Sequence, residues 1–346
     1  MNPAIDEPLD ARALKPWLFE NVPGFKGLRE IVKFDGGQSN PTFRIEADSG
    51  RYVLRAQPPG DLLDKAHAVD REYAVMRALR DTNVPVPRMR ALCDERDSSP
   101  IGRKFFVMEM LDGEVHHDPA LPDHTAEQRT AIFAAMRDAL VALHGVDVAE
   151  VGLDEFGRPG DYFARQLSVW TRQYRASETD TIEAMDRLIA WLEANMPPDD
   201  GQVALVHGDW RLDNLMFAPG EPRVIGVLDW ELSTLGHPMA DLAYQIMAWR
   251  LPHDGPFRGL GGVDRAALGL PSDDEYVAAY CAARGIERPG WFDFATAHAA
   301  FRFAAILQGV FKRSIQGNAS DPMRARQLGR AVPMLASLAL EWVGEN

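Results

Sequence analysis

The chain has 346 residues, of which 46% are hydrophobic and 25% charged, as in an ordinary globular protein of one large or two smaller domains. Its 37 basic and 51 acidic side chains give a net charge of −14 at pH 7. The excess acid lies late in the chain, because residues 1–110 hold 17 basic and 17 acidic side chains and residues 111–346 hold 20 and 34. Binding to nucleic acid or to an anionic membrane requires clustered lysine and arginine, so we expect neither partner.

Three further features favour a cytoplasmic protein. The two cysteines, Cys93 and Cys281, are too few for a disulfide framework and too far apart for a CxxC motif. The first ten residues are acidic and lack the apolar stretch of a signal peptide. No run of 18 apolar residues predicts a membrane span.

The N-terminal third has the pattern of a small antiparallel sheet. Apolar runs separated by Gly, Pro, Asp and Ser turns predict five strands, at residues 28–34, 41–47, 51–55, 89–95 and 104–111. Apolar residues at helical spacing predict one helix, at 67–80. We therefore predict a first domain over residues 1–110.

Beyond residue 113 the pattern is mainly helical. Stripes of apolar residues predict helices around 125–143, 163–174 and 188–196, and further helices from about 239 to the end. Short strands are expected at 203–209 and 223–230, and an irregular segment rich in Gly and Pro at 251–271. The predicted fold class is α+β, with a larger second domain over residues 111–346.

Two motifs carry the chemistry, LVHGDWRLDNLMF at 205–217 and VIGVLDWE at 224–231. Asp209 and Asn214 lie five residues apart after one strand, and Asp229 ends the next, so the three would converge if those strands pair as a hairpin. Mg²⁺ takes oxygen ligands from one or two protein groups, which suits Asn214 and Asp229. Asp209 would then accept the proton of an attacking hydroxyl, as in kinase phosphoryl transfer.

These motifs resemble the aminoglycoside phosphotransferase and choline kinase family, whose members share the bilobal protein-kinase fold and phosphorylate small molecules. The resemblance extends to GHPMADLAY at 236–244. It implies that Asp241 supports the catalytic loop by hydrogen bonds and that His207 is also structural. ATP and Mg²⁺ are the implied cofactors.

The resemblance also places the nucleotide in the first domain. It implies a phosphate-covering loop with contacts from Gly37, Ser39 and Asn40. Arg55 stands where the family usually has a strand lysine, and its guanidinium can grip phosphate oxygens in the same way. The implied ion-pair partner of Arg55 is Glu72. The implied adenine-binding hinge contains Met108, Glu109 and Met110.

A finer resemblance concerns the acceptor. The segments GGQSNPTFRI, YVLRAQPPG, AHAVDREYAVMRAL and VPVPRM look like the kinase-like domain fused to acyl-CoA dehydrogenases and its free-standing bacterial relatives. This implies a small hydroxylated substrate, either a hydroxy acid or a hydroxyacyl-CoA. The acidic second domain suits a cationic acceptor such as an aminoglycoside better, unless local arginines form a basic patch. An inactive nucleotide-binding module is a further alternative.

Overall fold

The computed structural model describes residues 9–34, 40–59, 68–317 and 322–345. Its contacts divide the chain into two compact units. The first unit comprises Met1–Glu114 together with Met216–Pro219 and Ile225–Leu232. The second comprises Val115–Leu215, Gly220–Val224 and Ser233–Asn346. The predicted division at residue 110 did not include the two later segments that join the first unit.

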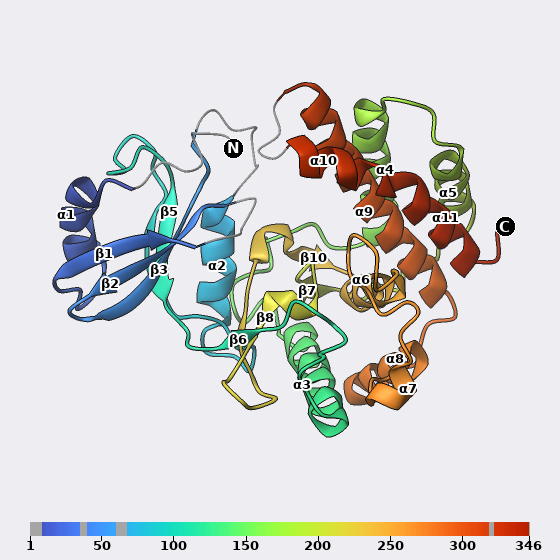
Figure 1. The fold of residues 1–346 in the computed structure, drawn as a ribbon, viewed down its shortest axis with the longest axis horizontal. Coiled ribbons are helices and arrows are strands. Elements are labelled where there is room, and N and C mark those ends of the chain that lie inside the picture. The colour runs from blue at the N-terminus through green and yellow to red at the C-terminus, as the bar shows by residue number, and fades with distance from the viewer. Residues whose placement is uncertain (1–8, 35–39, 60–67, 318–321, 346) are drawn as a thin grey trace. The chain divides into compact units, whose positions relative to one another are not determined.

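The first unit contains the predicted five-stranded antiparallel sheet, in the order β1-β2-β3-β5-β4 (Figure 1). Its strands are β1 (Leu28–Lys33), β2 (Thr42–Ala47), β3 (Gly50–Ala56), β4 (Met89–Cys93) and β5 (Phe105–Glu109). Side chains alternate between the two faces of each strand. Phe105 and Val107 belong to the core beneath one face, whereas Phe106 contacts Tyr73 on the other.

One helix packs on each face of this sheet. Helix α2 (Val69–Leu79) is the predicted one and contacts β4 and β5. Helix α1 (Ala11–Asn21) was not predicted, because Pro16 in its interior argues against a helix. Asp10 caps α1, and its Leu14 and Leu18 are fully buried in the core of the opposite face. The alternation along β3 therefore turns Arg55 toward the face that α2 covers.

The second unit is mainly helical. Its helices are α3 (Ala126–His144), α4 (Tyr162–Ser177), α5 (Glu183–Ala194), α6 (Met239–Arg250), α7 (Arg265–Leu268), α8 (Asp273–Arg284), α9 (Phe292–Ile315), α10 (Pro322–Gly329) and α11 (Ala331–Trp342). Helix α9 packs against α4, α5, α6, α10 and α11. It is long and apolar enough to cross a membrane by length and composition, but 72% of its most apolar window is buried, as in the core helix of a globular protein.

The expected hairpin of the two motif strands does not form. Strand β7 (Ala204–Val206) pairs antiparallel with β10 (Thr234–Gly236) instead. Strand β9 (Val224–Val227) lies beside β8 (Leu215–Phe217), which neighbours β6 (Glu114–Val115). The short 3₁₀ turns η1 (Leu212–Asn214) and η2 (Trp230–Leu232) follow β7 and β9. Because β8 has only three residues, its pattern was too short to be recognised.

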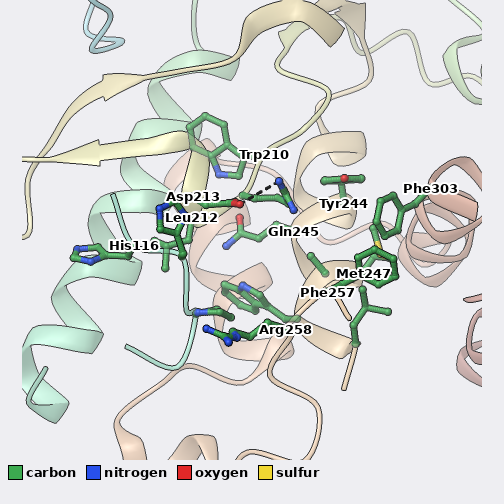
Figure 2. Close-up of a pocket in the computed structure, with 16 residues that line it drawn as sticks. His116, Trp210, Leu212, Asp213, Tyr244, Gln245, Met247, Phe257, Arg258 and Phe303 are labelled. Atoms are coloured by element: carbon green, nitrogen blue, oxygen red, sulfur yellow. Dashed lines mark ion pairs between the residues drawn. The ribbon is translucent and has the colours of Figure 1, made fainter. Parts of the chain in front are cut away.

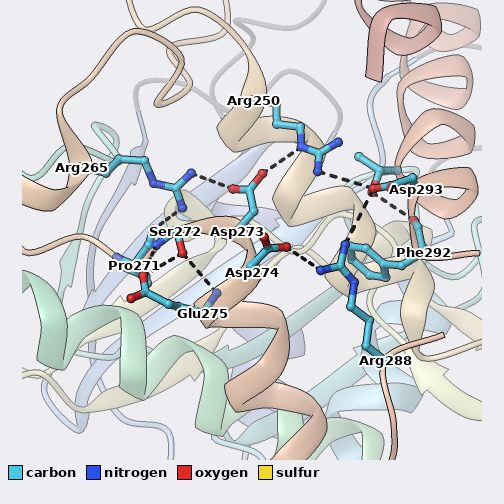
Figure 3. A network of polar contacts seen from close by, with 11 residues as sticks. Arg250, Arg265, Pro271, Ser272, Asp273, Asp274, Glu275, Arg288, Phe292 and Asp293 are labelled. Carbon is cyan, nitrogen blue, oxygen red and sulfur yellow. Dashed lines mark hydrogen bonds and ion pairs between the residues drawn. The ribbon is translucent and has the colours of Figure 1, made fainter. Parts of the chain in front are cut away.

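The segment between α6 and α8 is held at both ends by one carboxylate (Figure 3). Asp273 accepts from Arg250 Nε at 2.8 Å and from Arg265 Nη1 at 2.7 Å. Within the segment, a Cβ atom on Gly259 would lie 2.1 Å from the carbonyl oxygen of Leu251, so this close approach requires glycine. The segment predicted as irregular is thus a fixed structure that contains α7.

We predict that Asp273→Ala destabilises the protein by about 2–3 kcal/mol, because it leaves two partly buried guanidinium groups without their carboxylate. Asp274→Ala is the matched control. Asp274 neighbours Asp273 and also binds an arginine, but its side chain is 82% exposed and its loss should change little. Urea unfolding measures both variants. Equal losses of unfolding free energy in the two variants would contradict the structural role of Asp273.

Candidate active site

A buried carboxylate fixes the backbone just before Asp209. Asp241, in the first turn of α6, accepts from the N–H of His207 with Oδ2 at 2.7 Å and from the N–H of Gly208 with Oδ1 at 2.7 Å. Gly208 has a φ of +85°, which glycine adopts without strain. The His207 ring is fully buried, and its Nδ1 accepts from the N–H of Asp209 at 3.2 Å.

Asp241 has a second set of partners that the sequence did not reveal. His144 Nε2 lies 3.1 Å from Asp241 Oδ2, and His144 Nδ1 lies 2.6 Å from the hydroxyl of Tyr280. Burial would raise the pKa of Asp241, but the bond and charge of His144 and the neighbouring donors hold it below its usual value. These residues come from α3 and α8, so no sequence spacing connects them to the catalytic loop.

Asp209 is held in a defined position as an ionised group. Asn214 Nδ2 donates to the Asp209 carbonyl oxygen at 2.8 Å and to its Oδ2 at 3.0 Å. Arg211 Nε lies 3.3 Å from Asp209 Oδ1. Burial raises the pKa of Asp209, but the Arg211 charge and a hydrogen bond from Tyr244 outweigh it and lower the pKa overall. Asp209 can therefore accept a proton at neutral pH.

Tyr244 is the last residue of the 236–244 motif, and the sequence alone predicted no role for it. It lies three residues after Asp241 on α6, which places both side chains on the same side of the helix. The periodicity of α6 could have indicated this. Asp213, which is also part of the catalytic loop, pairs with Arg211 Nη2 at 3.1 Å.

The first unit brings Arg55 together with two carboxylates. Arg55 Nε lies 3.0 Å from Oε2 of Glu72, and Arg55 Nη2 donates to Oδ1 of Asp229 at 2.7 Å. Glu72 is buried on α2, and burial raises its pKa to about 7 although Arg55 lowers it. Asp229 follows β9 with a φ of +63°, a conformation that is costly for a residue other than glycine and that is common at functional sites.

The predicted phosphate contacts differ in outcome. Gly37 and Ser39 lie outside the described residues. Asn40 is buried, and its Nδ2 donates to Oε1 of Glu72 at 2.8 Å. Its amide therefore satisfies the second oxygen of a buried carboxylate, a role that was not predicted. Asn40 lies two residues before β2, the strand that pairs with the strand of Arg55.

Part of the predicted hinge already pairs with neighbouring strands of the sheet through its backbone. Met108 pairs with Val53 on one side and Met89 on the other, so β5 is not an edge strand at this point. The N–H of Glu109 donates to the carbonyl oxygen of Arg88 at 2.9 Å. The N–H of Met110 reaches only the carbonyl oxygen of Arg51, at 3.4 Å. Of the three, Met110 has the backbone donor that is least well satisfied within the sheet.

The predicted metal ligands have suitable donor atoms. The Asn214 amide nitrogen makes the bonds to Asp209, which leaves its oxygen on the opposite side of the amide group. Asp229 uses Oδ1 for Arg55, and its side chain is 34% exposed. An amide oxygen and a carboxylate fit Mg²⁺, which takes few protein ligands besides phosphate and water. Among the described residues, no group of three or more His, Cys, Asp or Glu could hold a metal.

A pocket lies beside the loop that carries Asp209, within the second unit (Figure 2). The four residues that follow Asp209 contribute to its wall, as does Tyr244. Aromatic and apolar side chains form most of the remainder, with two histidines and one further arginine. The lining residues include His116, His117, Arg211, Asp213, Tyr244, Arg258 and Phe303.

Comparison with known proteins agrees with this geometry. The sequence profile of the phosphotransferase enzyme family matches residues 30–295. The chain belongs to this family. A crystal structure of a candidate aminoglycoside phosphotransferase from Ralstonia eutropha is 45% identical and has a TM-score of 0.87, with 97% of this chain and 98% of that chain covered. The phosphotransferase APH(4)-Ia, in complex with AMP-PNP and hygromycin B, shares the fold at 13% identity and a TM-score of 0.62, with 97% and 100% covered.

The curated relatives are longer proteins. Acyl-CoA dehydrogenase family member 10 of Mus musculus is 46% identical over 91% of this chain and 29% of its own length. Acyl-CoA dehydrogenase family member 11 of Homo sapiens is 40% identical over 90% of this chain and 40% of its own length. This phosphotransferase family chain thus spans less than half of each. Both the predicted family and the predicted fold class are confirmed.

We predict a pH-dependent contribution of Glu72 to stability. Its pKa in the folded protein is about 7, above the usual 4.5, so the contribution is complete below about pH 4.5 and is lost as the pH rises through 7. The free energy of unfolding of the wild type relative to Glu72→Gln should therefore fall by about 2–3 kcal/mol between pH 5 and pH 8.

Urea unfolding at several pH values measures this difference. Glu46→Gln is the control, because Glu46 is a partly exposed glutamate of the same unit, on β2, that pairs with Arg44. A constant difference between wild type and Glu72→Gln across this range would refute the prediction.

Proposed function

We propose that this chain is an ATP- and Mg²⁺-dependent kinase that phosphorylates a hydroxyl group of a small molecule, either a hydroxy acid or a hydroxyacyl-CoA. The observation that carries the proposal is the ionised carboxylate of Asp209, held by Asn214 and Tyr244 on a loop whose backbone Asp241 fixes. A positioned carboxylate of this kind is what phosphoryl transfer to an alcohol requires.

In the proposed reaction, Asp209 accepts the proton of the acceptor hydroxyl as its oxygen attacks the γ-phosphorus of ATP. Asn214 and Asp229 would hold Mg²⁺, which neutralises charge on the phosphates when bound. Positioning and electrostatic stabilisation supply most of the rate enhancement, because phosphoryl transfer needs little covalent chemistry from the protein.

Arg55 is the proposed phosphate-binding residue. A guanidinium has five N–H donors, and the contacts with Glu72 and Asp229 use one on Nε and one on Nη2. Three donors remain for phosphate oxygens. Glu72 keeps the guanidinium in place, because the ion pair between them is buried on the Glu72 side. Gly37 and Ser39 stay predictions for the loop that covers the phosphates.

The pocket favours an anionic acceptor with an apolar part. Four of its lining residues carry or can carry positive charge: His116, His117, Arg211 and Arg258. Its one carboxylate, Asp213, already pairs with Arg211. Arg211 also pairs with Asp209, and Arg258 lies 3.7 Å from Asp118. The lining residues themselves still include more basic than acidic side chains, which favours a hydroxy acid or acyl-CoA. The likeness to members of the acyl-CoA dehydrogenase family supports the same acceptor class.

Two alternatives remain testable. An aminoglycoside or other cationic acceptor is suggested by the solved relatives, but a polycation would find little negative charge in this pocket. A catalytically inactive nucleotide-binding module is disfavoured by the presence of Asp209, Asn214 and Asp229 together. A module of that kind would be stabilised by ATP without Mg²⁺ and would consume no ATP with any acceptor.

We predict that Asp209→Asn lowers kcat by about 10²–10⁴-fold, because the general base is lost, while ATP still raises Tm as in the wild type. Transfer of the γ-phosphate is measured with hydroxy acids, their CoA esters, aminoglycosides, choline and amino sugars. Asp186→Asn is the control, since Asp186 is an exposed partner of Arg175 on α5. Undiminished turnover in Asp209→Asn would sink the proposed role of Asp209.

A further inference from the structure

Arg302 is a buried cation that has no acidic partner among the residues that the structure describes. It lies on α9 and is only 7% exposed. Its Nε is buried and has no hydrogen-bond partner. Within the part of the chain that the structure describes, Arg302 has no ion pair with an aspartate or glutamate and no hydrogen bond to a carbonyl oxygen. Such a group is rare, because an uncompensated charge in a protein interior costs several kcal/mol.

Four other arginines of the second unit have acceptors. Arg250 and Arg265 share Asp273, and Arg288 pairs with Asp274 at 2.5 Å (Figure 3). Arg129, which is about as buried as Arg302, donates to backbone carbonyl oxygens, two of them at 3.0 Å. Arg302 therefore differs from its neighbours in lacking acceptors, not in being an arginine of a helical core.

Aromatic rings surround the Arg302 guanidinium. Its central carbon lies 5.7 Å from the ring centroid of Trp170 on α4 and 5.8 Å from that of Tyr244 on α6. Cation–π contacts of this length stabilise a guanidinium and offset part of its desolvation. They supply no negative charge and accept no strong hydrogen bond. The rings thus hold the guanidinium in position and leave its donors for another group.

The position of Arg302 connects it to the acceptor pocket. Tyr244, whose ring faces Arg302, lines the pocket and interacts with Asp209. Phe303, the next residue on α9, also lines the pocket. Arg302 is not itself a lining residue, but Tyr244 lies next to both its guanidinium and Asp209.

We propose that Arg302 binds an oxyanion of the acceptor substrate and so selects acceptors that carry a negative charge. This inference rests on the proposed function and names the substrate class of that site. The oxyanion is either the carboxylate of a free hydroxy acid or a phosphate of a CoA carrier, since both offer oxygens to a guanidinium fork. Arg302 is a specificity residue and takes no part in the proton transfer.

Binding measurements test this without relying on turnover. The ligands are hydroxycarboxylates of three to six carbons, their CoA thioesters, and their primary amides as neutral isosteres. We expect the wild type to bind the anionic members at least 10-fold more tightly than the amides, and Arg302→Met to lose this preference. Arg313→Met is the control, because Arg313 is an exposed arginine on the same helix.

The two sources of the oxyanion give different results. If free hydroxycarboxylates bind in an Arg302-dependent manner, the carboxylate is the group bound. If only the CoA thioesters do so, a phosphate of the carrier is bound. Equal affinity of the wild type for acids, thioesters and amides, or an unchanged preference in Arg302→Met, overturns the proposal.

The stability of the ligand-free protein gives a second readout. Removing an uncompensated buried charge while keeping the volume of the stem should leave Tm unchanged or raise it, whereas removing a structural arginine lowers it. If Arg302→Met does not fold, Arg302→Lys replaces it, with the preference for anions retained but weakened. Failure to phosphorylate any acceptor, with Arg302-dependent anion binding intact, would count against the kinase assignment alone.

Discussion

The loop that carries Asp209 depends on one buried carboxylate. Asp241 accepts the N–H groups of the two residues before Asp209 and is itself held by His144. Because Asp241 and Tyr244 lie one turn apart on α6, the same helix fixes the backbone of the loop and hydrogen-bonds the Asp209 carboxylate. The position of the proposed general base thus depends on α6 and on His144 of α3, not on the loop alone.

The pairing of buried charges is the second feature that organises the molecule. Buried or half-buried charges are paired almost everywhere, as with Arg55 between Glu72 and Asp229 and Asp273 between two arginines. The net charge of −14 accordingly says little about the pocket, whose side chains are mainly aromatic or basic. Against this background, the unpaired guanidinium of Arg302 indicates a place where the ligand supplies the missing charge.

Local patterns predicted the five strands, helix α2 and the residues of the catalytic loop, because each depends on residues close together in the chain. Pairing over long distances was not predictable. The hairpin that would have joined the two motif strands does not form. Strand β7 pairs with β10, and the three-residue β8 lies beside β9. His144 and Tyr280 support Asp241 from helices about a hundred residues before it and about forty after it, and Asn40 reaches Glu72 across 32 positions. The periodicity of apolar residues in the sequence does not indicate such distant partners.

The most direct test of the account is a competition in one reaction. Wild-type protein is given Mg²⁺, ATP labelled in the γ-phosphate, a mixture of hydroxycarboxylates and their CoA thioesters, and an aminoglycoside, and the labelled products are separated. The account predicts label on the anionic acceptors, none on the aminoglycoside, and none on either with Asp209→Asn. Label on the aminoglycoside, or ATP binding with no labelled acceptor at all, would contradict it.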